Sequence, residues 1–194
     1  MISRLKGTLL TRDLGSVEVE TSGGVVYEVE VPLTVVERLP SEGAQIELRT
    51  LQVVREDSVS LFGFLKPHER ELFKRLLSAS GVGAKLALAM LSTYSAPRLA
   101  QALVERDLAA LTQISGVGKK TAERISLELA DRVKDLALVQ EGFPGGSPLV
   151  EGAVSALVAL GYTFSDADTA VRKALVPGED PTTEELIKKA LSGD

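Results

Sequence analysis

The first third of the chain alternates apolar and acidic residues, which is the pattern of β-strands with one buried face. Val17–Glu20 and Val25–Val31 both alternate in this way, and Ser22–Gly24 between them has the composition of a hairpin turn. Further strands are expected at Ile2–Leu10, Ile46–Arg55 and Val59–Phe64, with a short helical connection at Pro32–Leu39. These elements predict a small Greek-key barrel of the oligonucleotide/oligosaccharide-binding (OB) type over residues 1–63.

From residue 64 onward the apolar positions change to the spacing of amphipathic helices. The residues that follow this spacing are Leu72, Phe73, Leu76, Leu77, Leu86, Leu88, Ala89, Leu91, Leu108, Leu111, Ile114, Ala122, Ile125, Leu129 and Val133. We predict a bundle of about five helices over residues 64–136. The bundle contains one duplicated unit, which is too short an array for a solenoid.

A stretch rich in glycine and proline, Glu141–Pro148, follows the bundle and predicts a flexible linker over residues 137–149. Beyond it, Val154, Leu157 and Leu160 form one apolar face, and Pro181–Glu185 begins a last helix. We predict a three-helix, UBA-like module over residues 150–194, whose small core leaves apolar surface for a partner. The predicted fold class is therefore multidomain α+β.

Composition excludes several kinds of protein. The 194 residues include no cysteine and one histidine, so a disulfide framework, a zinc finger and thiol catalysis are all excluded, and we expect neither a metal nor a cofactor. The start of the chain has no apolar signal core and no run reaches membrane-spanning length, which predicts a cytoplasmic protein without membrane contact. Tryptophan is absent, which argues against an aromatic platform for stacking single-stranded bases.

Charge is distributed unevenly around a net value of −5. Residues 1–63 carry 6 Lys and Arg against 10 Asp and Glu, and residues 137–194 carry 4 against 9. Residues 64–136 carry 12 against 8, so the helical bundle is the only basic region. Its sign suits contact with phosphates.

Two similar phrases lie 35 residues apart in this basic region, Ser80–Lys85 and Ser115–Lys120. In each, the first glycine suits a left-handed turn after a helix, and the second lets the backbone approach a ligand closely. The next residues begin a helix whose N–H groups and positive dipole end form an anion site. The pair is typical of helix-hairpin-helix motifs that bind the DNA backbone. The predicted phosphate-binding residues are Gly81, Gly83, Ala84 and Lys85 in the first, and Gly116, Val117, Gly118, Lys119, Lys120 and Arg124 in the second.

Other interpretations of these phrases fit less well. A nucleotide-binding P-loop would need Ser or Thr directly after Lys119, where the chain has Lys120. A DNA glycosylase of the helix-hairpin-helix group would need a catalytic aspartate about eighteen residues after Lys120, and Leu138 stands there. A purely structural glycine corner remains an alternative for either phrase alone. A single-strand-binding or scaffold protein that uses the barrel is a further alternative, although the barrel is acidic.

Glu56 and Asp57 interrupt an apolar stretch and are predicted at a hairpin tip, where acidic residues are usually only solvated. A resemblance gives them another interpretation. Val53–Asp57 with Leu61–Phe64 resembles the RuvA family, the junction-binding subunits of the bacterial branch-migration machine. The segments Met1–Gly7, Gly23–Val29, Gly118–Arg124 and Ala156–Tyr162 resemble the family too, in the same order along the chain.

The resemblance implies a homotetramer that holds a four-way (Holliday) DNA junction open and square, and that a second tetramer can cap to form an octamer. Glu56 and Asp57 would be an acidic pin near the crossover, with Arg55 as a basic residue at the junction centre. The resemblance also implies that the C-terminal module binds RuvB, the hexameric ATPase motor, through Leu157, Leu160 and Tyr162. It allows the RuvC junction resolvase as a further partner, and it implies a role in recombination and repair without intrinsic catalysis.

Overall fold

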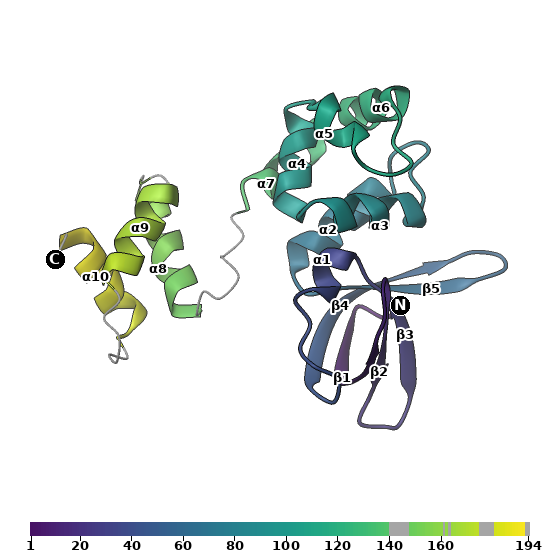
Figure 1. Ribbon diagram of the computed structural model, residues 1–194, viewed down its shortest axis with the longest axis horizontal. Helices are drawn as coiled ribbons and strands as arrows, with labels where there is room; N and C mark the ends of the chain where they lie inside the picture. Colours follow the sequence, from purple (N-terminus) through teal and green to yellow (C-terminus); the bar gives the residue numbers. More distant parts are fainter. Residues whose placement is uncertain (140–147, 161, 163, 175–180, 193–194) are drawn as a thin grey trace. The chain divides into compact units, whose positions relative to one another are not determined.

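In the computed structural model of the protein, the alternating segment at the start of the chain forms a closed five-stranded barrel (Figure 1). The order around the barrel is β1-β2-β3-β5-β4, and every pairing is antiparallel except that of β3 with β5. The strands are β1 (Arg4–Arg12), β2 (Ser16–Glu20), β3 (Val26–Glu30), β4 (Gln45–Val54) and β5 (Val59–Phe64), with helix α1 (Leu33–Val36) between β3 and β4. The predicted OB-like barrel with one short helical connection is confirmed.

The structure describes residues 1–139, 148–160, 162, 164–174 and 181–192. They belong to two compact units, Met1–Gln140 and Glu141–Asp194. Of the linker predicted at residues 137–149, residues 140–147 lie outside the described part. Helix α7 ends at Ala137 on one side of this gap, and α8 begins at Pro148 on the other.

The barrel interior follows from the alternating pattern. Val17, Val19 and Val29 are buried. Glu18, which lies between the first two valines, and its partner across the strands, Glu28, lie on the outer side. Val17 pairs with Val29 across β2 and β3, so apolar residues meet on the inner face. The acidic residues of these strands are thus compatible with a buried core because every second position faces solvent.

The β4–β5 hairpin extends well beyond the barrel as a two-stranded arm (Figure 1). Its last paired residues are Val54 and Val59, both largely exposed. The N–H of Arg55 donates to the carbonyl of Ser58 over 2.8 Å, which closes the turn. Glu56 and Asp57 therefore lie at the end of the arm, as the sequence predicted.

The basic segment of residues 64–136 is helical. It contains α2 (Pro67–Leu76), α3 (Ala84–Thr93), α4 (Ala96–Val104), α5 (Leu108–Thr112), α6 (Lys119–Leu129), a 3-10 turn (Ala130–Arg132) and α7 (Lys134–Ala137). The five helices expected from periodicity are present, and the last two short elements extend the chain beyond them. Two glycine-containing turns, between α2 and α3 and between α5 and α6, correspond to the duplicated phrases.

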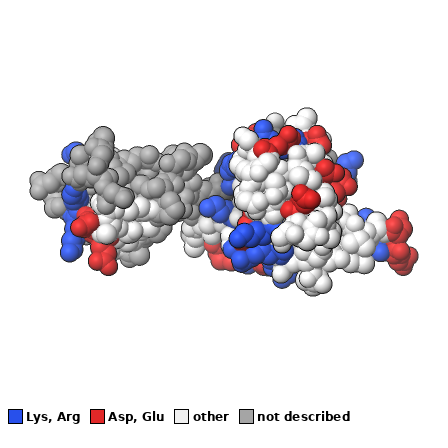
Figure 2. Space-filling model, turned by 90° about the horizontal axis from the view of Figure 1, so that it is seen from below, with Lys and Arg blue, Asp and Glu red and all other residues white. Residues whose placement is uncertain are grey.

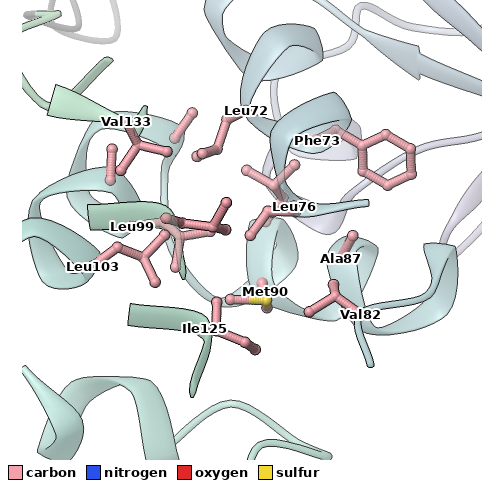
Figure 3. Packing of buried hydrophobic residues seen from close by; sticks show 14 of the residues in the cluster. Leu72, Phe73, Leu76, Val82, Ala87, Met90, Leu99, Leu103, Ile125 and Val133 are labelled. Atoms are coloured by element: carbon pink, nitrogen blue, oxygen red, sulfur yellow. The ribbon is translucent and has the colours of Figure 1, made fainter. Parts of the chain in front are cut away.

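One apolar cluster fills the bundle and continues into the barrel. Leucines of α2 and α4 meet Met90 and Ile125 in its centre (Figure 3). The ring of Phe73 lies with its centroid 4.9 Å from that of Phe62 and 5.1 Å from that of Phe64, both on β5. The barrel and the bundle therefore share this cluster across residues 63 and 64, where the sequence predicted a boundary, while the barrel interior has a second apolar cluster of its own.

A carboxylate with 4% relative exposure joins the barrel to the bundle. Glu69, in the first turn of α2, accepts the N–H groups of Leu65 and Lys66 over 3.0 and 2.9 Å. Its other oxygen pairs with the guanidinium of Arg38, which follows α1. Because a buried charge is tolerated only with such partners, this network holds α1 and α2 in one arrangement.

Helix α1 also binds the bundle through its backbone and side chains. The hydroxyl of Thr34 donates to the carbonyl of Leu91 over 2.7 Å, and the N–H of Leu33 donates to Ser92 Oγ over 3.0 Å. The barrel and bundle are therefore connected by hydrogen bonds as well as by packing.

The second unit consists of α8 (Pro148–Ala159), α9 (Phe164–Ala174) and α10 (Thr183–Ser192), which surround a small core. Before α10, the N–H of Thr182 donates to Glu185 over 2.8 Å, and the N–H of Glu185 donates to Thr182 Oγ1 over 3.3 Å. The hydrogen bond from Thr182 lowers the pKa of the Glu185 carboxyl below its ordinary value. The predicted three-helix module is confirmed. Among the described residues, none of the helices has the length and apolar character to span a bilayer.

The buried network predicts a large effect of removing its carboxylate. Glu69→Ala should lower the free energy of unfolding by about 3 kcal/mol, because Arg38 and two N–H groups lose their partner. Chemical denaturation should show this loss, and Glu123→Ala, which removes an exposed carboxylate from α6, should change the free energy of unfolding by less than about 0.5 kcal/mol. Equal stability of the two variants would contradict the role given to Glu69.

Candidate nucleic-acid interface

The two predicted helix-hairpin-helix turns have nearly identical backbones. We call residues 80–85 the first hairpin and residues 115–120 the second hairpin. Gly81 and Gly116 have φ of 79° and 86°, and Gly83 and Gly118, which precede α3 and α6, have φ of −90° and −85°. The duplication seen in the sequence is therefore a duplication of geometry.

The two glycines of each hairpin have different reasons to be glycine. The positive φ of Gly81 and Gly116 is a backbone conformation that other residues rarely adopt. Gly83 and Gly118 have extended backbones, and no heavy atom of the described residues lies within 4 Å of where their Cβ atoms would be. The fold does not require glycine at these two positions, so the open space in front of α3 and α6 is available to a ligand.

Backbone N–H groups at the starts of α3 and α6 face this space. In the described part of the chain, no side chain caps either helix at Gly83 or Gly118. Val117 is one of the predicted phosphate-binding residues, but its N–H donates to the carbonyl of Ile114 over 3.0 Å and so already has a partner within the turn. The N–H groups of Gly118 and Lys119 remain the second hairpin's predicted donors.

Side chains in the hairpins divide into anchors and exposed cations. Val82, Ala84 and Val117 are buried in the bundle core, so Ala84 and Val117 offer a ligand only their backbone. The exposed cations are Lys85 next to the first hairpin's helix start, and Lys119, Lys120 and Arg124 on α6. Each hairpin thus combines a helix N-terminus with exposed positive charge, which is a favourable site for phosphate.

The two hairpins contact each other through side chains from the opposite motif. A Cβ on Gly81 would lie 2.5 Å from Nη2 of Arg124, and one on Gly116 would lie 3.3 Å from Cδ1 of Leu86. The guanidinium of an α6 residue therefore covers the first hairpin's turn. Sequence reasoning assigned Arg124 to the second hairpin, and the structure places it between the two.

The tip of the β4–β5 arm differs from the hairpins in charge, because it is acidic, and in shape, because it projects from the barrel. Glu56 and Asp57 are exposed, and the hydroxyl of Ser58 donates to Asp57 over 3.2 Å. Figure 2 shows the arm as a narrow projection that ends in acidic side chains. Two adjacent carboxylates at the end of a projection repel phosphates that approach it.

Arg55, which precedes the acidic tip, faces a hollow that residues of the first hairpin also line. It lines this shallow hollow of about 190 Å³ together with Lys85, although the two residues are far apart in the sequence. The other lining residues are Glu30, Val53, Ser58, Ser60, Phe62 and Ala84. Sequence reasoning missed Glu30 here, because its place in an alternating strand indicated only a solvated carboxylate.

The apolar patch expected on the C-terminal module is smaller than predicted. Leu157 has 1% relative exposure and belongs to the module's core, so it cannot contact a partner directly, and its place in the predicted patch is corrected. Leu160 and Tyr162 are 64% and 47% exposed. They follow the end of α8, where the N–H groups of both residues donate to the carbonyl of Leu157. Gly161 between them lies outside the described residues.

Within the described ranges, no group of three or more His, Cys, Asp or Glu side chains could hold a metal ion.

Three family models match the chain, in an order that follows its structure. A model described as the RuvA N terminal domain matches residues 1–63, and one described as a SAM-like helix-hairpin-helix tandem matches residues 73–131. A model described as the RuvA C-terminal domain matches residues 148–193. The first covers the barrel and the projecting arm, the second both hairpins, and the third the three-helix module.

Similar proteins match over nearly the whole chain, and each is named Holliday junction branch migration complex subunit RuvA. The protein of Gemmatimonas aurantiaca is 44% identical over 192 residues, which cover 99% of this chain and 98% of that protein. That of Pseudomonas paraeruginosa is 45% identical over 206 residues, covering 100% and 99%, and that of Opitutus terrae is 44% identical over 201 residues, covering 99% and 100%. The chain belongs to the RuvA family.

Proposed function

We propose that this protein is a non-catalytic subunit that binds four-way DNA junctions, holds them open and square, and recruits a motor for branch migration. The observation that carries the proposal is one compact unit in which two hairpins suited to binding phosphate are combined with a projecting acidic tip. The names of full-length relatives support the same function, since each is a Holliday junction branch migration complex subunit.

The hairpins would hold the duplex arms. Exposed N–H groups at the starts of α3 and α6 would contact phosphates, and Lys85, Lys119 and Lys120 would add long-range attraction. These contacts do not involve base edges, so the grip is independent of sequence. Such independence is needed by a protein that must stay bound while the junction moves.

The acidic tip would select the shape of the DNA. Continuous duplex laid along the hairpins would bring its phosphates toward Glu56 and Asp57, and like charges repel strongly at short range. In an open junction the DNA strands pass around a central opening. The acidic tip would occupy this opening, where no phosphate lies directly against it. Arg55, beside the tip and on the hollow with Lys85, would attract the strands that leave the centre.

Assembly extends this proposal beyond one chain. A four-armed junction suits a homotetramer, in which each subunit holds one arm, and a second tetramer on the other face would give an octamer. The C-terminal module would bind the RuvB hexameric ATPase through Leu160 and Tyr162, with Leu157 supporting them from the core. RuvC is proposed as an alternative occupant of the open junction face. Because the substrate is chromosomal DNA in recombination and repair, the proposed location is the cytoplasm.

The proposal is tested first by comparing the affinity for a four-way junction, a matched linear duplex and a single strand. The wild-type protein should bind the junction at least about 100-fold more tightly than the duplex and should cleave none of them. Glu56→Lys with Asp57→Lys should raise duplex affinity about tenfold and reduce junction preference, because the repulsion becomes attraction. Gel-shift titrations at several salt concentrations measure both effects.

Glu28→Lys with Glu37→Lys gives the same gain in charge on exposed parts of the barrel and should retain junction preference. Unchanged preference in the tip variant would refute the role of the tip. Equal wild-type binding to junction and duplex would make the protein a generic duplex binder, and strand cleavage would make it an enzyme.

Gly83→Ala and Gly118→Ala should separate binding from folding. Their extended backbones accept alanine and the space around them is empty, so the only cost to stability is that alanine caps a helix less well than glycine, and melting temperatures should fall by no more than about 4 °C. Duplex affinity should fall about tenfold for each, because the methyl group occupies the path of a phosphate. Gly116→Ala, which introduces a side chain at φ of 86° and 3.3 Å from Cδ1 of Leu86, should lower the melting temperature further than either of these variants. Full affinity in both Gly83→Ala and Gly118→Ala would show that no ligand approaches these glycines.

Lys119→Glu with Lys120→Glu should weaken binding to junction and duplex alike, by about 100-fold at low salt, and should flatten the dependence of affinity on salt. Fluorescence anisotropy over a range of potassium chloride concentrations measures the slope. Lys134→Glu, on α7, reverses one charge outside both hairpins and should retain the wild-type slope. A slope unchanged in the double variant would place the phosphate contacts elsewhere.

A further inference from the structure

Helix α6 is connected to both hairpins. Its first residues, Lys119 and Lys120, belong to the second hairpin, and Arg124 lies one to two turns further along. The guanidinium of Arg124 covers Gly81 of the first hairpin. Any side chain at position 81 would collide with this guanidinium. The same helix therefore determines where the second hairpin begins and where the first hairpin can lie.

Glu128 makes a second contact from α6 to the first hairpin. Its Oε2 accepts the N–H of Ser80 over 2.9 Å, across 48 residues of sequence. Ser80 directly precedes Gly81, whose positive φ turns the chain toward α3. The hydrogen bond thus holds the residue at which the first hairpin begins its turn.

A carboxylate at this place is unfavourable for DNA binding if only charge is considered. It lies beside a hairpin that we propose to bind phosphate, and a negative charge there repels the ligand. Glu128 also faces the same side of α6 as Arg124, since residues four apart on a helix are neighbours. Its value must therefore come from the geometry that it holds and not from its charge.

We propose that Glu128 is a positioning residue that keeps the first hairpin in register with the second, so that both hairpins bind phosphates of one DNA arm together. This inference rests on the proposed function of the hairpins. Two sites held at a fixed spacing bind far more tightly than two that move independently, because the second contact is then intramolecular. Arg124 contributes to the same register by packing on Gly81.

The proposal and simple electrostatics predict opposite results for one substitution. Glu128→Ala removes a negative charge, so electrostatics alone predicts tighter DNA binding. Loss of register predicts weaker binding, by about tenfold for a linear duplex and for a four-way junction. It also predicts that the slope of log affinity against log salt falls by about one, because the first hairpin loses a phosphate contact. Anisotropy titrations of the full-length protein at four salt concentrations measure both quantities.

Glu128→Gln and Glu123→Ala complete the experiment. The glutamine retains an acceptor for the Ser80 N–H, so it should restore at least half of the lost affinity. Glu123→Ala removes an exposed carboxylate from the same helix without touching the first hairpin, so it should bind DNA as tightly as wild type or more tightly. Melting curves of all three variants should remain close to wild type, which separates register from folding.

Binding by Glu128→Ala that equals or exceeds that of wild type would overturn the positioning role and leave the proposed function intact. Weaker binding that glutamine does not restore would overturn it too, since the carboxylate's charge would then matter more than its acceptor. Failure of the wild-type protein to bind any DNA would instead refute the proposed function itself.

Discussion

A buried carboxylate at the joint between barrel and bundle determines where the candidate DNA-binding groups of the first unit lie. Glu69 accepts hydrogen bonds from two backbone N–H groups and pairs with the guanidinium of Arg38. Its buried charge is therefore compensated only when α1 and α2 are in their observed arrangement. Phe73 packs on Phe62 and Phe64 of β5, which adds an apolar contact between barrel and bundle. The acidic tip is a continuation of β4 and β5, and the hairpins are continuations of α2 and α5. Their separation is therefore a property of this joint.

The cations of the hairpins and the carboxylates of the acidic tip have different effects on bound DNA. Cations around the hairpins supply attraction that any duplex would satisfy, and this attraction is screened by salt. The carboxylates of Glu56 and Asp57 supply a penalty that depends on where the DNA backbone runs. Selectivity for a branched shape needs both, because attraction alone cannot distinguish a junction arm from ordinary duplex. The net charge of the whole chain is negative, so the positive charge of the bundle becomes visible only when the charges of residues 64–136 are counted separately.

Much of the fold could be predicted because it is encoded locally. The alternation at Val17–Glu20 identified a strand and its inner face, and the Gly-Val-Gly phrases identified both hairpins and the residues at their turns. Predictions that depended on burial across elements were less accurate. The helical spacing of Leu157 fits an apolar patch on the surface and a core position equally well. Only its packing against α9 and α10 shows that it is buried. A local contact also changed one prediction: Val117 was among the predicted phosphate-binding residues, and its N–H donates to the carbonyl of Ile114 within the turn.

The sequence by itself determined the strands and their inner faces, the paired hairpins, the acidic tip and the charge of each region, because each of these can be identified from residues close together in the chain. The likeness to a family followed from several such short segments in one order. Tertiary structure alone decided the contacts between distant segments. Arg55 and Lys85 line one hollow, the guanidinium of Arg124 covers Gly81, and Glu128 accepts the N–H of Ser80. The physical reason is that periodicity shows which face of an element is buried but not which residue of another element it will meet. That pairing depends on how the barrel and helices pack around their shared core.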